Sequence, residues 1–405
     1  MPEAVIVATA RSPIGRAFKG SLKELRPDDL AVQMVQAALA KVPELDPGEI
    51  DDLMLGCGQP GGESGFNMAR IVAVLAGMDH LPGTTVNRYC SSSLQTTRMA
   101  LHAIRAGEGD VFVSAGVETV SRFGKGNADG LPDTENPLFA EAQDRTERCA
   151  GGGQTWVDPR SEGMVPDAYI AMGQTAENVA QLKGVTREDQ DAFGVRSQNL
   201  AEKAMADGFW ARDITPVMLP DGSRVTTDDG PRAGVTLEAV SGLQPVFRPD
   251  GTVTAANCCP LNDGAAAVVI MSDTRARQLG ITPLARIVST GVTGLSPEIM
   301  GLGPVEASKQ ALARARMTID DIDMVEINEA FAAQVIPSAR DLGIDEDRLN
   351  VNGGAIAVGH PFGMTGARIT STLINSLQHH DKHLGLETMC VGGGQGMAMV
   401  LERLS

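Results

Sequence analysis

Residues 4–10, Ala-Val-Ile-Val-Ala-Thr-Ala, can be aligned with residues 285–291, Ala-Arg-Ile-Val-Ser-Thr-Gly. Residues 49–55, Glu-Ile-Asp-Asp-Leu-Met-Leu, resemble residues 321–327, Asp-Ile-Asp-Met-Val-Glu-Ile, in the same order along the chain. This internal repeat predicts two similar halves in which strands alternate with helices. We therefore expect an α/β fold with a mixed, largely parallel sheet that is covered on both faces.

Three further features extend the repeat. Each half continues with a Val-Asn pair, at Val86 and Val351, then a loop that holds a reactive residue, and then a run with helical periodicity. The first run ends at Gly107, a residue type that commonly caps helix C-termini, and the second covers residues 365–377. We expect the two loops to be related by a pseudo-twofold axis.

The first half also carries an insertion of about 130 residues, a length typical of lids and binding loops. It separates a predicted strand at residues 110–118 from another at residues 253–272. Residues 119–168 are rich in Gly, Asp and Pro and are predicted to be loop. Residues 171–208 have a helical pattern, and residues 219–252 return to turns.

Length and composition limit the class of protein. A chain of 405 residues can bury a large core in two or three domains, and with 42% apolar but only 3% aromatic residues that core must be aliphatic. The formal net charge of −17 argues against nonspecific binding of nucleic acid, because phosphates require basic surfaces. No apolar run reaches the ~20 residues that span a bilayer.

The chain ends and the cysteines bear on location. The first residues, Met-Pro-Glu-Ala, resemble neither a secretory signal nor a transit peptide, and the last, Glu-Arg-Leu-Ser, are not a peroxisomal signal. The cysteines form no C-x-x-C pair and no dense framework, which indicates reduced thiols and leads us to expect a cytoplasmic protein. They stand at positions 57, 90, 149, 258, 259 and 390.

Cys90 lies between a strand-like segment and the first predicted helix, within residues 86–97. Free N–H groups and the helix dipole at a helix N-terminus favour the thiolate, which is the form that attacks carbonyls. A single cysteine is nevertheless more often a buried structural residue. Cys90 alone does not decide between these interpretations.

Three other segments hold versatile side chains. Residues 351–368 and 388–398 set His360 and Cys390 in glycine-rich backbone, where main-chain N–H groups can approach a ligand closely. Asn328 follows an apolar, strand-like stretch. Taken singly, each segment has an ordinary structural explanation, and the glycines near Cys390 lack the G-x-G-x-x-G spacing of a dinucleotide loop.

Taken together, these segments resemble the thiolases, a family of acyl-CoA acetyltransferases. The resemblance covers nearly the whole chain, and its blocks occur in the order that the family has. The blocks are Asn87–Ser92, Met172–Glu177, Asn262–Ala267, Asn328–Phe331, Gly359–Pro361 and Cys390–Gly396.

The resemblance implies duplicated βαβαβαββ halves in α/β/α/β/α layers. The N-terminal half would be residues 1–272, with a coenzyme A-binding loop domain inserted at about 120–250, and the C-terminal half residues 273–405. The implied reaction is reversible acyl transfer between coenzyme A and acetyl-CoA, by Claisen condensation or thiolytic cleavage of a 3-ketoacyl-CoA. Acyl-CoA, acetyl-CoA and coenzyme A would be its substrates, without a metal or further cofactor, in a homodimer or homotetramer.

The resemblance also implies catalytic roles. Cys90 would carry the acyl group, His360 would take its proton, and Cys390 would act as acid and base toward the α-carbon or the departing thiol. One oxyanion site would use His360 and a water held by Asn328. The other would use the backbone N–H groups of Cys90 and Gly392.

Coenzyme A contacts follow in the same way. The side chains expected to shape the pantetheine tunnel are Met172, Phe247, Ala255 and Phe331, each of which would otherwise be taken as apolar packing. Local positive charge for the phosphates is expected from Arg232 and Arg248. Cys259 stands where many thiolases have a serine that contacts coenzyme A, and we expect Cys258 and Cys259 to be small buried residues.

Some features leave alternatives open. Ala171 stands where acetoacetyl-specific thiolases often have a histidine, and the run that begins at Thr365 resembles degradative thiolases. The run that begins at Gly392 instead resembles acetyl-CoA acetyltransferases, so the preferred acyl chain length stays open. A ketoacyl synthase shares the fold but uses a second histidine where this chain has Cys390. A noncatalytic acyl-CoA-binding scaffold is the third interpretation.

Overall fold

The computed structural model describes residues 2–129 and 131–405. The first half follows the expected βαβαβαββ order, and the second follows it except at the third strand. The first half contains β1 (Ala4–Arg11), α1 (Pro27–Leu39), β3 (Asp52–Gly56), α2 (Met68–Leu75), β4 (Gly83–Val86), α3 (Ser92–Ala106), β5 (Val111–Thr119) and β8 (Asn262–Ser272). The second contains β9 (Ala285–Gly294), α10 (Gly303–Ala315), β10 (Met324–Ile327), α11 (Ala332–Leu342), α13 (Thr365–His379), β11 (Leu384–Val391) and β12 (Gln395–Arg403). The counterpart of β4 in the second half is a single parallel bridge between Val325 and Leu349.

Each half forms one part of a continuous sheet. The strand order is β4-β3-β5-β8-β1 in the first half and β10-β11-β12-β9 in the second. The two parts join where β1 and β9 pair through only two residue pairs, Val5 with Arg286 and Ile6 with Ala285.

The expectation of a largely parallel sheet is wrong. Among the described strands of this sheet, the β3–β4, β3–β5 and β10–β11 pairs are parallel. The antiparallel pairs include β5–β8, β1–β8, β1–β9, β11–β12 and β12–β9. The reason is visible in the second half, where a tight turn joins β11 directly to β12, and a hairpin requires antiparallel strands. In the first half the long insertion replaces that turn.

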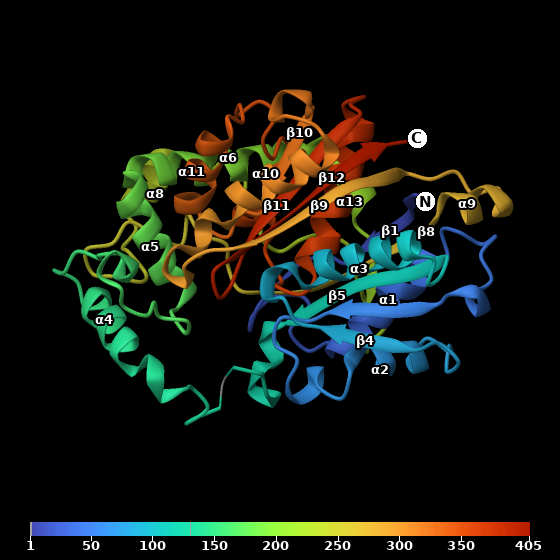
Figure 1. The fold of residues 1–405 in the computed structure, drawn as a ribbon, viewed down its shortest axis with the longest axis horizontal. Coiled ribbons are helices and arrows are strands. Elements are labelled where there is room, and N and C mark those ends of the chain that lie inside the picture. Colours follow the sequence, from blue (N-terminus) through green and yellow to red (C-terminus); the bar gives the residue numbers. More distant parts are fainter. Residues whose placement is uncertain (1, 130) are drawn as a thin grey trace.

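The helices and the two parts of the sheet form five layers (Figure 1). Three apolar clusters fill the spaces between these layers. Helices α1 and α2 cover the outer face of the first sheet, α3 and α13 lie between the two sheets, and α10 and α11 cover the second sheet. Because both faces are buried, successive residues of β1 enter different clusters. Val5 and Val7 pack in the cluster between the sheet and helices α1 and α2, whereas Ala4 and Ile6 pack in the cluster around α3 and α13.

The two central helices bring the predicted reactive loops together. As expected, α3 ends at Gly107, whose left-handed φ of 77° caps the helix. Near its start, α13 approaches α3 so closely that a Cβ on Gly366 would lie 2.1 Å from the backbone nitrogen of Leu94. Only glycine allows this contact, which places the loops that precede both helices side by side.

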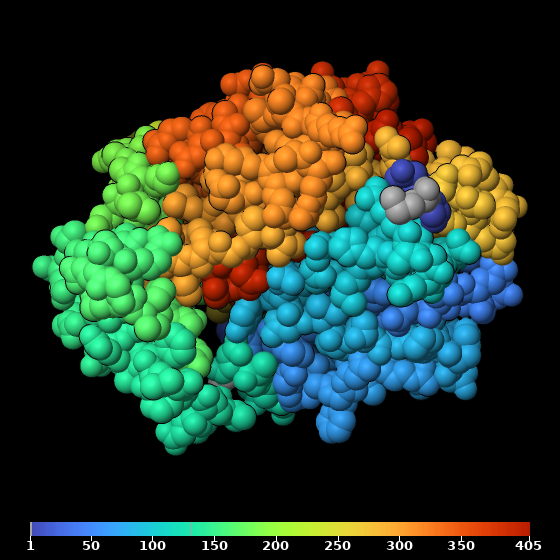
Figure 2. Space-filling view, viewed as in Figure 1, coloured from blue at the N-terminus to red at the C-terminus, as the bar shows by residue number. Residues whose placement is uncertain are grey.

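The insertion forms one end of the molecule and lies against both halves (Figures 1 and 2). The helical pattern of residues 171–208 is confirmed by α5 (Met172–Lys183) and α6 (Arg187–Ala206). Two expectations are wrong: residues 119–168 include the polar helix α4 (Ala140–Ala150), and β8 begins at Asn262 instead of residue 253. Among the described helices, none is long and apolar enough to cross a bilayer.

Candidate active site

Cys90 lies in a tight turn between β4 and α3. The turn is a single 3-10 segment, Tyr89–Ser91, and Tyr89 adopts a left-handed φ of 43° that is uncommon outside glycine. Asn87 holds this geometry by accepting a hydrogen bond from the Tyr89 N–H at 2.8 Å, and the Ser92 hydroxyl donates to the Tyr89 carbonyl at 2.6 Å. Cys90 is therefore at a helix N-terminus, as predicted.

Backbone N–H groups lower the pKa of Cys90, as expected at this position, but burial outweighs them. Cys90 is only 8% exposed, and burial raises its pKa to about 12, although the backbone N–H groups of Gly392 and of Cys90 itself act in the opposite direction. The cost of desolvating a thiolate exceeds the stabilisation from these N–H groups. The resting sulfur is a thiol, so a nucleophilic attack requires a nearby proton acceptor.

His360 has the protonation state of such an acceptor. Its Nδ1 lies 2.6 Å from the Thr365 hydroxyl, and that hydroxyl donates its own proton to the Pro361 carbonyl at 2.7 Å. Nδ1 must therefore carry a hydrogen and donate it, which leaves a lone pair on Nε2. Burial, together with the charge of Arg368, lowers the pKa of His360 to about 3, so the ring is neutral.

Replacing His360 with alanine tests this role. We expect His360→Ala to slow alkylation of Cys90 by iodoacetamide near neutral pH by at least about tenfold, equivalent to one unit in the effective pKa of the thiol. The reaction is followed by mass spectrometry across pH 6–10. His80→Ala, at an exposed site, is the matched control. Equal alkylation rates in wild type and His360→Ala at every pH would make His360 a structural residue.

Asn328 and Cys390 are the other two side chains that the sequence predicts to be catalytic. The Asn328 amide nitrogen lies 3.3 Å from His360 Nε2, and its amide oxygen is buried without a donor among the described residues. Cys390, on β11, is fully buried beside Met300 and Phe331. Burial and the neighbouring Cys90 thiol raise the pKa of Cys390.

A mainly apolar cavity of about 670 Å³ opens onto Cys90 and His360. The structure thereby brings together the nucleophile from the first half and the histidine from the second. Every residue predicted for the coenzyme A tunnel except Arg248 also lines this cavity. These residues are Met172, Arg232, Phe247, Ala255, Cys259 and Phe331.

Comparison with known proteins agrees with this geometry. Residues 4–274 match the thiolase N-terminal domain and residues 281–403 the thiolase C-terminal domain. The chain belongs to the thiolase family. A 3-ketoacyl-CoA thiolase of Bacillus subtilis (strain 168) is 42% identical to it over 415 residues, covering 99% of this chain and 100% of the relative.

Two further relatives have different names. A 3-oxoadipyl-CoA/3-oxo-5,6-dehydrosuberyl-CoA thiolase of Escherichia coli (strain K12) is 42% identical over 413 residues and covers 100% of both chains. The crystal structure of the Bacillus anthracis acetyl-CoA acetyltransferase superposes with a TM-score of 0.85 at 38% identity, covering 100% of this chain and 99% of that one. The thiolase fold and duplication are therefore confirmed.

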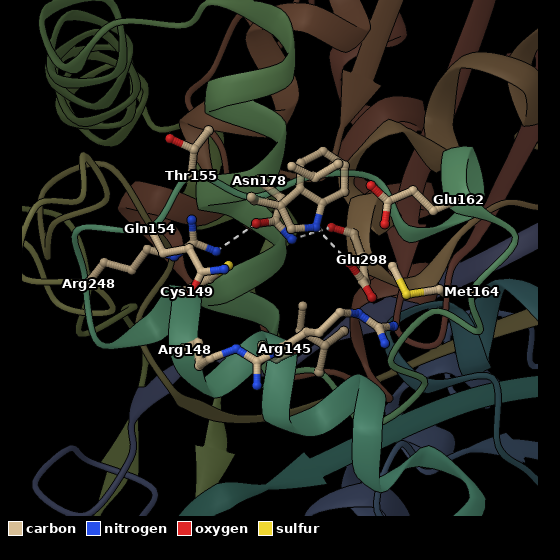
Figure 3. Close-up of a pocket in the computed structure, with 14 residues that line it drawn as sticks. Arg145, Arg148, Cys149, Gln154, Thr155, Glu162, Met164, Asn178, Arg248 and Glu298 are labelled. Atoms are coloured by element: carbon tan, nitrogen blue, oxygen red, sulfur yellow. Dashed lines mark hydrogen bonds between the residues drawn. The ribbon is translucent and has the colours of Figure 1, made fainter.

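The expectation for Arg248 is not met in this thiolase. Arg248 is buried and donates from Nε to the Gln174 side chain at 2.7 Å and from Nη2 to Asn178 at 2.6 Å. It borders a separate cavity of about 240 Å³, shown in Figure 3. That cavity shares no lining residue with the one at Cys90. Arg248 links its own loop to α5 within the insertion and does not face the candidate active site.

Cys258 and Cys259 also differ from expectation. Both are partly exposed and line the active-site cavity, instead of being fully buried. The Cys259 N–H donates to the Ala330 carbonyl at 3.0 Å, and Cys258 forms an antiparallel bridge with Phe331. Burial still raises the pKa of Cys258 to about 11, so its thiol is neutral.

Sequence reasoning missed two cationic residues of the cavity and one link behind the site. Arg16 and Lys19 line the cavity with Arg232, and their signal was a pair of basic residues in the glycine-bounded loop after the first strand. Arg88 donates to the Gln395 side chain at 2.7 Å, and Gln395 donates to the Gly392 carbonyl at 3.2 Å. This link holds the Gly392 peptide beside the turn of Cys90.

Proposed function

We propose that this thiolase forms and cleaves 3-ketoacyl-CoA through an acyl group carried on Cys90. The main observation behind this proposal is that Cys90 and His360 both line the same mainly apolar cavity. Arg16, Lys19 and Arg232 are its charged lining residues, and all three are cations suited to the phosphates of coenzyme A. The names of the relatives support the same chemistry.

The first half-reaction transfers an acyl group. As Cys90 Sγ attacks the thioester carbonyl, His360 Nε2 takes the thiol proton, so a free thiolate with an unfavourable pKa need not accumulate. The new S–C bond replaces the bond to the coenzyme A sulfur, which leaves as a thiol with the proton of Cys390. Cys390 is then a thiolate, and His360 keeps the Cys90 proton on Nε2. The N–H groups of Cys90 and Gly392 stabilise the oxyanion, and losing one such donor typically costs about 10²–10³ in rate.

The second half-reaction makes the carbon–carbon bond. The Cys390 thiolate removes a proton from the α-carbon of acetyl-CoA, and the resulting carbanion attacks the acyl carbon on Cys90. The bond from that carbon to Cys90 Sγ breaks, and the sulfur takes its proton back from His360. His360, with Nε2 protonated, and a water held by Asn328 stabilise the enolate oxygen. Thiolysis is the reverse sequence, with Cys390 returning the proton. We infer no metal and no cofactor beyond the coenzyme A thioester itself.

Thiolysis of a series of 3-ketoacyl-CoA substrates tests this function. The expected result is loss of the 3-ketoacyl-CoA that depends on added coenzyme A and yields acetyl-CoA. The series includes 3-ketohexanoyl-CoA and 3-ketoadipyl-CoA, which differ only at the chain end and represent the two classes in the relatives' names. Absence of cleavage with every chain length would favour the noncatalytic scaffold.

Arg232 is the exposed cation expected to bind a coenzyme A phosphate. We expect Arg232→Ala to raise the KM for acyl-CoA about three- to tenfold with little change in kcat, because the lost contact is the same in ground and transition states. The difference in KM between Arg232→Ala and the wild type should become smaller at high salt, because salt screens exposed charges. Arg277→Ala, which breaks a surface pair with Asp273, is the control. An unchanged KM at low salt would contradict the assignment.

We also propose a cytoplasmic homodimer or homotetramer. Strand β4 ends the sheet of the first half and exposes its edge. Nearby apolar side chains are exposed on and just before α2, namely Phe66, Ile71, Val74 and Leu75. Such a face suits a second copy of the chain. Light scattering should give a mass of two or four chains, and a single 42.4 kDa species would contradict the proposal.

A further inference from the structure

A buried carboxylate, Glu118, joins the two halves beside the candidate active site. It stands near the end of β5 and is 0% exposed. Its Oε2 accepts hydrogen bonds from the N–H groups of Gly58 at 2.7 Å and Gly363 at 2.9 Å. Its Oε1 accepts from the Gln59 N–H at 3.2 Å and faces the Cys57 thiol at 3.8 Å. None of these four partners carries a full positive charge.

One of the four partners belongs to the histidine loop, residues 359–364. Gly363 is so close to the first half that a Cβ there would lie 2.4 Å from the Val117 carbonyl oxygen. The adjacent Phe362 packs edge-on against the His360 ring, with centroids 5.3 Å apart. Glu118 therefore ties the histidine loop of the second half directly to a strand of the first.

The other backbone partners lie between the two reactive residues. A Cβ on Gly58 would be 3.1 Å from the Phe362 Cβ and 3.6 Å from the carbonyl oxygen of Tyr89, the residue before Cys90. The segment that Glu118 holds is thus in contact with the histidine loop on one side and the turn of Cys90 on the other. A shift of this segment would move both.

We propose that Glu118 is a positioning residue whose ionised carboxylate holds the histidine loop at the distance from Cys90 that proton transfer requires. Glu118 does not line the cavity, so it acts through the loop and not on the substrate. The proposal rests on the proposed roles of Cys90 and His360. This positioning role requires the ionised form of Glu118. The four donors around it need the lone pairs of a carboxylate, whereas a protonated acid would point its own hydrogen at one of these donors.

The same charge makes the site sensitive to pH. Burial raises the pKa of Glu118 from 4.5 to about 7, against the effect of its N–H partners. The titratable groups facing it are the thiols of Cys57 and Cys90, whose own pKa values are raised by burial, so both stay neutral at pH 6–8. Activity should therefore increase as pH rises through about 7.

Stability should change in the opposite direction. An unfolded glutamate ionises near 4.5, whereas the folded one keeps its proton to about 7, so the folded state binds more protons in this window. The contribution of Glu118 to stability is then greatest below pH 4.5 and is lost as pH rises toward and through 7. A group that only stabilised the fold would not gain activity where it loses stability.

Glu118→Gln tests the proposal, with Glu298→Gln as the matched control. Glu298 is also a buried carboxylate held by N–H donors, the Trp156 indole at 2.6 Å and the Asp167 backbone at 2.8 Å, but it borders the separate cavity in Figure 3. We expect Glu118→Gln to lower kcat about 10²-fold, the usual cost of an ångström-scale misplacement, with KM nearly unchanged. It should also lose the rise in activity near pH 7, which Glu298→Gln keeps.

Two outcomes would overturn the proposal. One is a folded Glu118→Gln enzyme with the kcat and pH profile of the wild type. If Glu118→Gln does not fold, hydrogen exchange of the wild-type peptide containing Gly363 decides, and equal protection at pH 6 and pH 8, after correction for intrinsic exchange, overturns it. Failure of wild-type Cys90 to become acetylated would instead refute the proposed function.

Discussion

Cys90→Ala is expected to abolish both thiolysis and condensation. Both directions pass through an acyl group on this sulfur. Of the three cysteines that line the cavity, Cys90 is the one whose sulfur faces the Gly392 N–H. The fall in kcat should be on the order of 10⁶, as when the nucleophile of another covalent enzyme is removed. Coupled spectrophotometric assays in both directions measure it.

Cys149→Ala is the matched control for this loss. Cys149 is also a buried free thiol, but it borders the separate cavity of Figure 3. Its replacement should leave kcat within a few-fold of wild type, which shows that removal of a buried thiol is not itself harmful. Substantial activity in Cys90→Ala would require a different nucleophile, and Cys259, which faces the same cavity, would be examined next.

Cys390→Ala should separate the two half-reactions. Acetylation of Cys90 leaves the α-proton untouched, and His360 can protonate the departing coenzyme A sulfur in place of Cys390, so the variant should still accept an acetyl group. Exchange of deuterium from solvent into the methyl group of acetyl-CoA should fall by about 10²–10⁴, the usual contribution of a general base, and condensation should fall with it. Mass spectrometry measures acetylation and NMR measures exchange on the same preparation.

The second thiol is the feature that distinguishes this mechanism from a plain acyl transfer. If exchange and condensation survive in Cys390→Ala at near wild-type rates, Cys390 is a packing residue among Met300, Ala330 and Phe331. The base would then lie elsewhere. If acetylation is lost as completely as exchange, the substitution has disturbed the Cys90 pocket and not the second step alone.

Local signals predicted the parts of the fold that depend on neighbouring residues. The helix after Cys90 ends at Gly107 because glycine suits a left-handed cap, and this is readable from the chain. The repeat predicted the order of elements in both halves. Strand direction was mispredicted because alternation of strands and helices does not reveal that β5 and β8 are the two arms of a hairpin separated by an insertion.

The remaining features depend on contacts between distant parts of the chain. Arg248 and Arg232 look equivalent in sequence, yet Arg248 is bound by Gln174, more than 70 residues away, while Arg232 faces the cavity. Glu118 stands alone in an apolar strand, which hints at a buried charge, but its partner Gly363 is 245 residues away. Desolvation, which raises the pKa of Cys90, likewise depends on the complete tertiary structure.

Mass spectrometry of the wild-type protein after brief mixing with acetyl-CoA tests the central claim most directly. The account predicts one added acetyl group, 42 Da by the mass of C₂H₂O, on the peptide that contains Cys90, and its loss on addition of coenzyme A. An adduct confined to Cys57 or Cys259, or no adduct in a preparation that cleaves 3-ketoacyl-CoA, would contradict it.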